Sequence, residues 1–133
     1  MNSQANMEVA RSTGIRVVGV EQVRGRGIER VVRESLADLS RVARRIYVDF
    51  DIDVLDRAFA PACPGSKPGG LLPYELVRAA RCCGASPKVL AVVEVDPEKD
   101  IADNTVMAAA SCFLAFAEGL KSRIENSSGL HNL

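Results

Sequence analysis

The stretch YVDFDIDVLD, residues 47–56, sets aspartates at every second position of an apolar run. Asp49, Asp51 and Asp53 would point the same way along an extended strand. Carboxylates about 6 Å apart repel each other by roughly 3 kcal/mol, and a divalent cation between them would relieve that repulsion. Parallel sheets place ligand sites at the carboxyl ends of their strands. The pattern therefore favours a metal site at a strand end, with a solvated turn carrying surface acids as the alternative.

Short apolar runs alternate with amphipathic runs on both sides of this stretch. The sequence predicts strands at Ile15–Val20, Arg45–Phe50 and Lys88–Val95, and helices at Ile28–Val42, Pro73–Gly84 and Asp103–Leu120. In the last helix, Asp103 is the expected N-cap, and the expected inner face is Met107, Ala110, Leu114 and Ala117. The order βαβαβα implies an α/β fold with parallel strands joined by right-handed crossovers.

Composition narrows the class of protein. The 133 residues fit one domain, and 47% are apolar, which is enough for a packed core. Lys and Arg total 17, as do Asp and Glu, so the balance argues against a nucleic-acid partner. No apolar run approaches the roughly 20 residues that span a bilayer, and the first residues do not resemble a signal peptide. We therefore expect a cytoplasmic protein with no membrane partner.

The cysteines and the histidine limit the chemistry further. Cys63, Cys82, Cys83 and Cys112 form no CxxC pair, so reduced thiols are expected. The single histidine, His131, excludes any site that needs a pair of histidines. The connection at residues 54–72 holds three of the six prolines and three of the ten glycines. Connections of that length inside a compact domain are usually functional.

Several motifs, which occur in a fixed order along the chain and include this stretch, match the pattern of a known family. The runs DFDIDVLDRAFAP (49–61), PGGL (68–71) and EVDPEKDIADNT (94–105), with Glu75 between them, resemble the ureohydrolase family. This is the arginase, agmatinase and formimidoylglutamase group of binuclear manganese hydrolases, and the resemblance covers roughly residues 2–120. It implies the C-terminal half of a three-layer αβα fold around a parallel sheet. Residues 1–120 would form that half-domain, and residues 121–133 a disordered polar tail.

The resemblance also implies roles for individual residues. Asp51 matches the ligand that bridges two metal ions, and Asp53 matches a ligand of the second ion. Glu94 matches the catalytic acid that binds and orients the guanidinium or amidine group of the substrate. Asp56, Asp100 and Thr105 match positions whose side chains brace the loops around the site. Asp49 stands where many members have Ser, so it would add a charge beside the metal without being a ligand.

Two upstream motifs of the family, resembling GGDHS and DAHxD, do not occur in this sequence. A complete member holds two Mn²⁺ ions and hydrolyses a small guanidino or formimidoyl substrate. Here we expect weak or single-ion binding and an inactive isolated chain. The expected partner is an N-terminal half-domain, or further copies of the chain joined through open sheet edges. The alternative is a non-catalytic remnant that acts as an oligomerising or interaction module.

Overall fold

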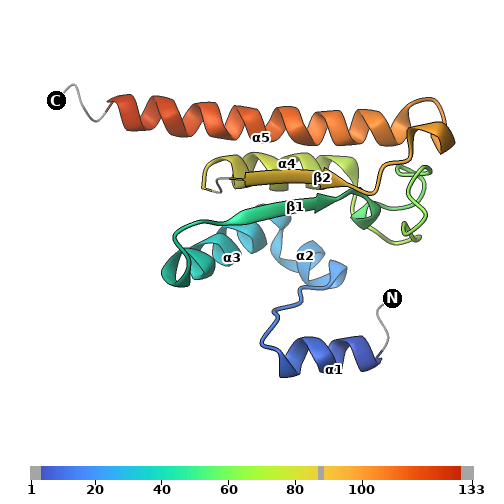
Figure 1. Ribbon diagram of the computed structural model, residues 1–133, viewed down its shortest axis with the longest axis horizontal. Helices are drawn as coiled ribbons and strands as arrows, with labels where there is room; N and C mark the ends of the chain where they lie inside the picture. Colours follow the sequence, from blue (N-terminus) through green and yellow to red (C-terminus); the bar gives the residue numbers. More distant parts are fainter. Residues whose placement is uncertain (1–3, 87–88, 130–133) are drawn as a thin grey trace.

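The computed structural model describes residues 4–86 and 89–129 (Figure 1). These residues form, in order, α1 (Gln4–Ser12), α2 (Val20–Arg26), α3 (Ile28–Val42), β1 (Tyr47–Asp51), the short 3-10 helix η1 (Ile52–Val54), α4 (Pro73–Gly84), β2 (Val89–Val93), the short 3-10 helix η2 (Pro97–Lys99) and α5 (Asn104–Gly129). None of the helices in this part of the chain is long and apolar enough to cross a membrane.

The two strands pair in parallel, which confirms the α/β class. Tyr47 lies opposite Val89, and Asp51 lies opposite Val93. The strand predicted at Ile15–Val20 is wrong, because residues 15–19 join no ladder and α2 begins at Val20. An extended apolar segment becomes a strand only when a neighbouring backbone pairs with it. In the described residues, β1 and β2 pair only with each other. Lys88, the predicted start of the third strand, lies outside the described residues.

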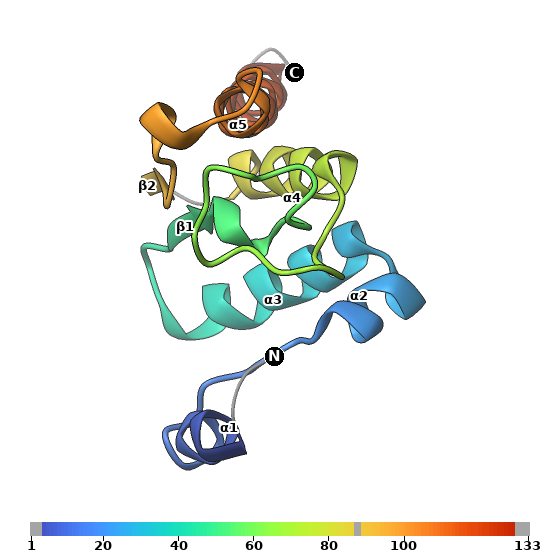
Figure 2. The ribbon, with the colours of Figure 1, turned by 90° about the vertical axis from the view of Figure 1, so that its right-hand side faces the viewer.

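Helices cover one face of this small sheet. Alternate strand residues pack into the core, namely Val48, Phe50, Leu90 and Val92. On the opposite face Tyr47, Val89 and Val93 stay exposed, at 59%, 50% and 36%. Figure 2 shows α3, α4 and α5 all on the same side of the two strands. The expected three-layer arrangement is therefore present only in part, as one strand layer and one helix layer among residues 4–86 and 89–129.

Two helices have the bounds that the sequence predicts. α3 runs from Ile28 to Val42, and α4 runs from Pro73 to Gly84. Pro73 suits the first turn of α4, where its missing N–H would have no partner inside the helix. Glu75 reinforces that start, since its Oε2 accepts a hydrogen bond from the backbone N of Leu72 at 2.8 Å.

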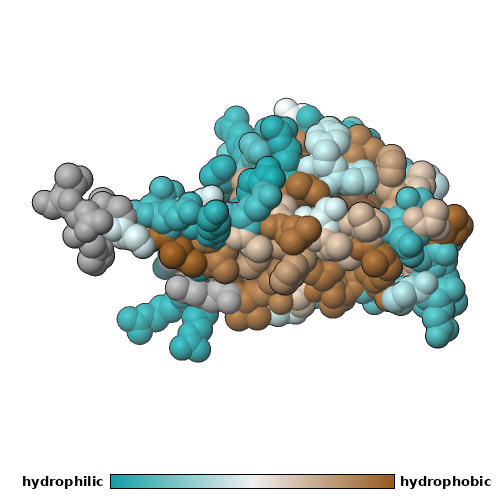
Figure 3. Space-filling view, turned by 90° about the horizontal axis from the view of Figure 1, so that it is seen from above, coloured by the Kyte–Doolittle hydropathy of each residue, from teal (hydrophilic) through white to brown (hydrophobic). Residues whose placement is uncertain are grey.

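The last helix differs from its prediction in three ways. Its first turn is capped by Asp100 rather than Asp103, because the Asp100 carboxylate accepts hydrogen bonds from the backbone N of Thr105 and Val106. The predicted inner face points outward, with Met107 and Leu114 exposed at 61% and 62%. Apolar side chains accordingly form a broad area on the face that Figure 3 shows. Finally, the helix continues past residue 120 to Gly129, so residues 121–129 are helical; residues 130–133 lie outside the described residues.

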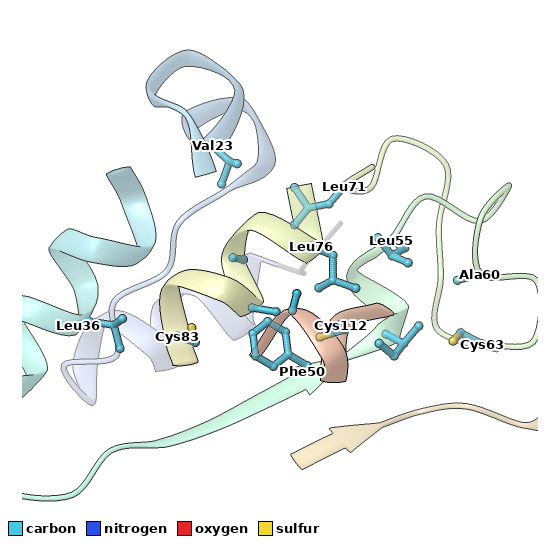
Figure 4. Close-up of a cluster of buried hydrophobic side chains, with 14 of the residues drawn as sticks. Val23, Leu36, Phe50, Leu55, Ala60, Cys63, Leu71, Leu76, Cys83 and Cys112 are labelled. Carbon is cyan, nitrogen blue, oxygen red and sulfur yellow. The ribbon is translucent and has the colours of Figure 1, made fainter. Parts of the chain in front are cut away.

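The core joins β1, the long loop, α4 and α5. Figure 4 shows Phe50 of β1 among the side chains of Leu76 and Cys112, which come from α4 and α5. α4 and α5 touch at two glycines. A Cβ on Gly84 would lie 2.1 Å from the Phe116 carbonyl oxygen, and one on Gly119 would lie 2.1 Å from the Arg81 carbonyl oxygen. Both glycines are therefore required for the two helix backbones to approach this closely.

Candidate functional site

Three acidic residues gather at the carboxyl ends of the strands. Asp51 ends β1, and Asp53 follows in η1. Asp51 is paired with Val93, so the next residue, Glu94, follows the neighbouring strand at the same carboxyl end of the sheet. The parallel register thus brings together two segments that lie far apart in sequence.

Asp51 and Asp53 are in direct contact. The Oδ1 atom of Asp51 accepts a hydrogen bond from the backbone N of Asp53 at 3.1 Å. Partial burial, followed by the charge of Asp51 and then that of Glu94, raises the pKa of Asp53, and Lys67 opposes this shift. Negative charge is therefore crowded at Asp53. A cation bound there would relieve this repulsion.

The long loop closes tightly over Asp53. A Cβ on Gly65 would lie 1.9 Å from the Asp53 Oδ2 atom, so any larger residue would have to displace that carboxylate. The loop is also joined back to itself through short bridges between Leu55 and Leu71 and between Asp56 and Lys67. The glycine at position 65 therefore lets backbone, rather than a side chain, form one wall of the site.

Glu94 has an uncommon backbone conformation. Its φ is 62°, in the left-handed region that non-glycine residues adopt rarely and that is found disproportionately at functional sites. The Cys63 thiol donates a hydrogen bond to the Glu94 carbonyl oxygen, with 2.6 Å between sulfur and oxygen. The Glu94 side chain remains exposed. The loop thus contacts Glu94 through its backbone, and the carboxylate is accessible to a solute.

Cys63 is a residue that the sequence reasoning did not assign to the site. Burial, with further contributions from Asp53, Asp51 and Glu94, raises the pKa of its thiol, while Ser66 lowers it. The thiol therefore stays protonated, and it serves as a hydrogen-bond donor rather than as a nucleophile. Gly65 and Lys67 were also missed. No sequence signal marks these residues, because their approach to Asp53 depends on the path of the loop.

The three expected bracing residues make loop contacts. Asp56 accepts hydrogen bonds from the backbone N of Ala58 and of Gly69, and these bonds lower its pKa. Burial alone would raise the pKa of Asp100, but hydrogen bonds from residues 105 and 106 outweigh it and lower the pKa. The buried Thr105 Oγ1 accepts a hydrogen bond from the backbone N of Ala62 at 3.1 Å. Their side chains therefore join the strand-end loops to one another.

The carboxylates do not form a complete metal centre. Among residues 4–86 and 89–129, no group of three or more His, Cys, Asp or Glu side chains could hold a metal ion. Asp49 is exposed on the same face of β1 as Asp51 and shows no side-chain hydrogen bond in that part of the chain. His131 lies outside the described residues. The site thus consists of two adjacent carboxylates, Asp51 and Asp53, with Glu94 beside them.

Comparison with known proteins places this chain in a family. A model of the arginase family matches residues 1–117. Formimidoylglutamase of Bacillus subtilis is 34% identical over 122 residues, which make up 90% of this chain and 38% of that protein. Formimidoylglutamase of Halalkalibacterium halodurans is 36% identical over 120 residues, 89% of this chain and 38% of that protein.

Solved structures agree with the sequence comparison. The crystal structure of B. subtilis formimidoylglutamase superimposes with a TM-score of 0.85 over 90% of this chain and 38% of that chain. Arginase from Bacillus caldovelox, 24% identical, has the same fold, with a TM-score of 0.80 over 86% of this chain and 39% of that one. The chain spans about 38% of the length of the formimidoylglutamases that it matches. It belongs to the arginase family and covers part of that family's fold.

Proposed function

We propose that this chain supplies part of the active site of a hydrolase that cleaves a C–N bond of a linear guanidino or formimidoyl compound. The observation that carries the proposal is the meeting of Asp51, Asp53 and Glu94 at adjacent strand ends in a chain of the arginase family. Its relatives include a formimidoylglutamase, a guanidinopropionase and an agmatinase. The substrates that these names indicate share an amidine or guanidine carbon.

Asp51 and Asp53 are the proposed ligands of Mn²⁺. Their carboxylate oxygens are the donor type that this ion accepts, and the raised pKa of Asp53 marks a place where positive charge is favoured. They fit the ion in kind but not in number, since the described residues offer no group of three ligands. In a complete member we expect two ions, which when bound supply an activated water for attack on the amidine carbon.

Glu94 is the proposed catalytic and substrate-binding residue. A carboxylate can pair with a guanidinium or amidinium group through two parallel, charge-assisted hydrogen bonds. Such a pair holds the reacting carbon in one orientation, which lowers the entropic cost of attack. The Glu94 side chain is exposed, so a substrate can reach it. Asp56, Asp100 and Thr105 brace the loops around it, and Asp49 adds negative charge nearby.

The isolated chain is proposed to be inactive or nearly so. Two carboxylates leave most of the coordination positions of an ion to water, and further copies of the chain would bring only the same ligands. A partner that carries the remainder of the site would be needed for hydrolysis. The sheet face that no helix covers exposes apolar side chains. This face favours a second candidate function, that of a non-catalytic interaction module. Hydrolysis by the chain together with such a partner distinguishes the two.

The cysteines support a cytoplasmic location for this proposed enzyme. All four are free, and all four are buried. Burial raises the pKa of Cys83 to about 12 and that of Cys112 to about 11, so both remain thiols. Free buried thiols are typical of proteins in a reducing compartment.

A calorimetric Mn²⁺ titration tests the metal assignment. The wild-type chain is compared with a chain carrying Asp51→Asn and Asp53→Asn. The control carries Glu21→Gln and Glu125→Gln, two exposed acids outside the site. We expect weak binding that the site variant loses and the control keeps. Equal binding by all three chains would refute Asp51 and Asp53 as the ligands.

A further inference from the structure

Glu94 leaves the regular pattern of the strand that precedes it. In a strand, alternate side chains share a face, so a straight continuation of β2 would turn Glu94 to the same side as Val92. Val92 packs against the buried core. Glu94 is instead exposed, and so is its neighbour Val93. The Glu94 side chain is therefore turned away from the helix-covered face of the sheet.

A left-handed backbone conformation accompanies this turn. The φ of Glu94 is 62°, although the residue before it, Val93, still belongs to the extended strand. Residues other than glycine rarely adopt such an angle unless the surrounding structure holds them in it. Burial, and after it the charges of Asp51 and Glu94, raise the pKa of Asp53. The conformation thus directs the charge of Glu94 toward the two aspartates.

The backbone is held on both sides of Glu94. On one side, Val93 is paired with Asp51 in the parallel ladder. On the other side, the Glu94 carbonyl oxygen accepts a hydrogen bond from the Cys63 thiol, with 2.6 Å between sulfur and oxygen. Because peptide groups are planar, the two backbone angles of a residue have little freedom once both of its flanking peptide groups are held. The Cys63 hydrogen bond therefore acts directly on the conformation of Glu94.

The long loop holds the donor itself in place. Cys63 is fully buried, its backbone N donates to the Ala60 carbonyl oxygen, and its carbonyl oxygen accepts from the backbone N of Ser66, each at 3.2 Å. The preceding residue, Ala62, donates from its backbone N to the Thr105 Oγ1 atom at 3.1 Å. Two consecutive loop residues thus fasten both ends of the segment that connects β2 to α5.

We propose that Cys63 is a positioning residue, whose thiol holds the Glu94 backbone in the left-handed conformation that turns the carboxylate toward the two aspartates. The proposal rests on the proposed function, because it explains the direction in which Glu94 would bind an amidine group. The thiol acts only as a hydrogen-bond donor, so a serine hydroxyl should replace it. An alanine side chain cannot donate and should release the Glu94 backbone.

Nuclear magnetic resonance of the full chain tests the conformation directly. At positive φ an amide proton lies close to the Hα of its own residue, which gives a strong nuclear Overhauser effect. We expect this signal at Glu94 in the wild type and in Cys63→Ser, and its loss in Cys63→Ala. Ala102 and Asp103, with φ of 50° and 56°, should keep the signal in every variant and show that the fold is intact. Cys112→Ala, at an equally buried cysteine, is the matched control and should keep the signal at Glu94.

Kinetics provide the second measurement, in a chimera in which residues 4–129 replace the matching part of B. subtilis formimidoylglutamase. Cys63→Ala should lower kcat/KM for formimidoylglutamate about tenfold or more, because a misdirected group no longer orients the substrate. Cys63→Ser, which restores the donor, should recover most of that loss, and Cys112→Ala should show none.

Three results would each overturn the proposal. They are a Glu94 signal that persists in Cys63→Ala, a signal that is lost in Cys63→Ser, and equal kcat/KM in the Cys63→Ala and parent chimeras. A parent chimera without activity would count against the proposed function alone, because the resonance measurement still decides whether Cys63 holds Glu94.

Discussion

At the scale of single residues, Gly65 controls the position of Asp53. A Cβ at position 65 would overlap the Asp53 Oδ2 atom. Gly65→Ala should therefore push the flexible Asp53 side chain aside and leave the surrounding fold intact. Displacing a group that positions a metal ligand typically costs about 10-fold or more in affinity. Mn²⁺ titration should show that loss with an unchanged circular dichroism spectrum. Gly25→Ala, where a Cβ would meet nothing within 4 Å, is the control. Unaltered affinity in the Gly65 variant would contradict this role.

Asp100 should make the stability of α5 depend on pH. Hydrogen bonds from the first turn hold its pKa below the ordinary value of 3.8. Its contribution is therefore fully present above pH 3.8 and is lost as the pH falls through the lowered pKa of the folded state. Asp100→Ala should lower Tm at pH 7, and its difference from the wild type should shrink in acid. Calorimetry between pH 7 and pH 2 checks this. A difference that stays constant with pH would contradict it.

The N-cap of α5 shows which contacts of single residues can be predicted from the sequence. Asp103 was the predicted cap, and Asp100 is the observed one. Asp103 stands directly before the helix, which is where a cap is expected. Its φ of 56° belongs instead to the tight turn that brings Asp100 back to the helix start. The resemblance to the ureohydrolases, rather than strand alternation, named Asp51, Asp53 and Glu94 together. The expectation of three aspartates along one extended strand was wrong, because β1 ends at Asp51 and Asp53 lies in η1. The contacts of Cys63 and Gly65 could not be predicted, because they follow from the path of an irregular loop.

At the scale of elements, the close packing of α4 on α5 depends on glycine. Gly119→Val should force the two backbones apart, since a Cβ at this position would lie 2.1 Å from the Arg81 carbonyl oxygen. Overpacking of this kind typically costs 1–3 kcal/mol, so we expect a loss of about 2 kcal/mol in the free energy of unfolding. Ala117→Val, at an exposed position of the same helix, should lower it by no more than about 0.7 kcal/mol, because only the lower helix propensity of valine acts there. Urea unfolding measures both, and equal losses would argue against the glycine contact.

The same helix explains one failure of prediction from sequence. α5 is apolar on more than one side, with Cys112 and Ala115 buried and Met107 and Leu114 exposed. Periodicity identifies a helix, but it cannot choose between two apolar faces when the neighbouring layer is unknown. α4 was predicted to the residue because Pro73 and Gly84 mark its ends, and α3 was predicted closely from the spacing of its apolar positions. The segment at residues 15–19 was misassigned because strand propensity does not specify a pairing partner.

At the scale of the whole molecule, the structure is a portion of a larger architecture. In the described residues one sheet face is uncovered and the outer edges of both strands are unpaired, and the chain matches about 38% of the length of its relatives. The core behind the sheet is nevertheless complete enough to place Asp51, Asp53 and Glu94 together. The α/β class and the family could be predicted from sequence motifs. That residues 4–86 and 89–129 contain a single helix layer could not be predicted, because local patterns report on elements rather than on layers.

A chimera in which residues 4–129 replace the matching part of B. subtilis formimidoylglutamase should hydrolyse formimidoylglutamate if Asp51, Asp53 and Glu94 form part of an active site. We expect Mn²⁺-dependent release of glutamate and a loss of about 100-fold or more in kcat for Glu94→Gln. Glu98→Gln, at an exposed acid in η2, should keep full activity. A folded, Mn²⁺-loaded chimera that releases no glutamate would refute the proposed function, and a Glu94→Gln chimera as active as its parent would refute the role of Glu94.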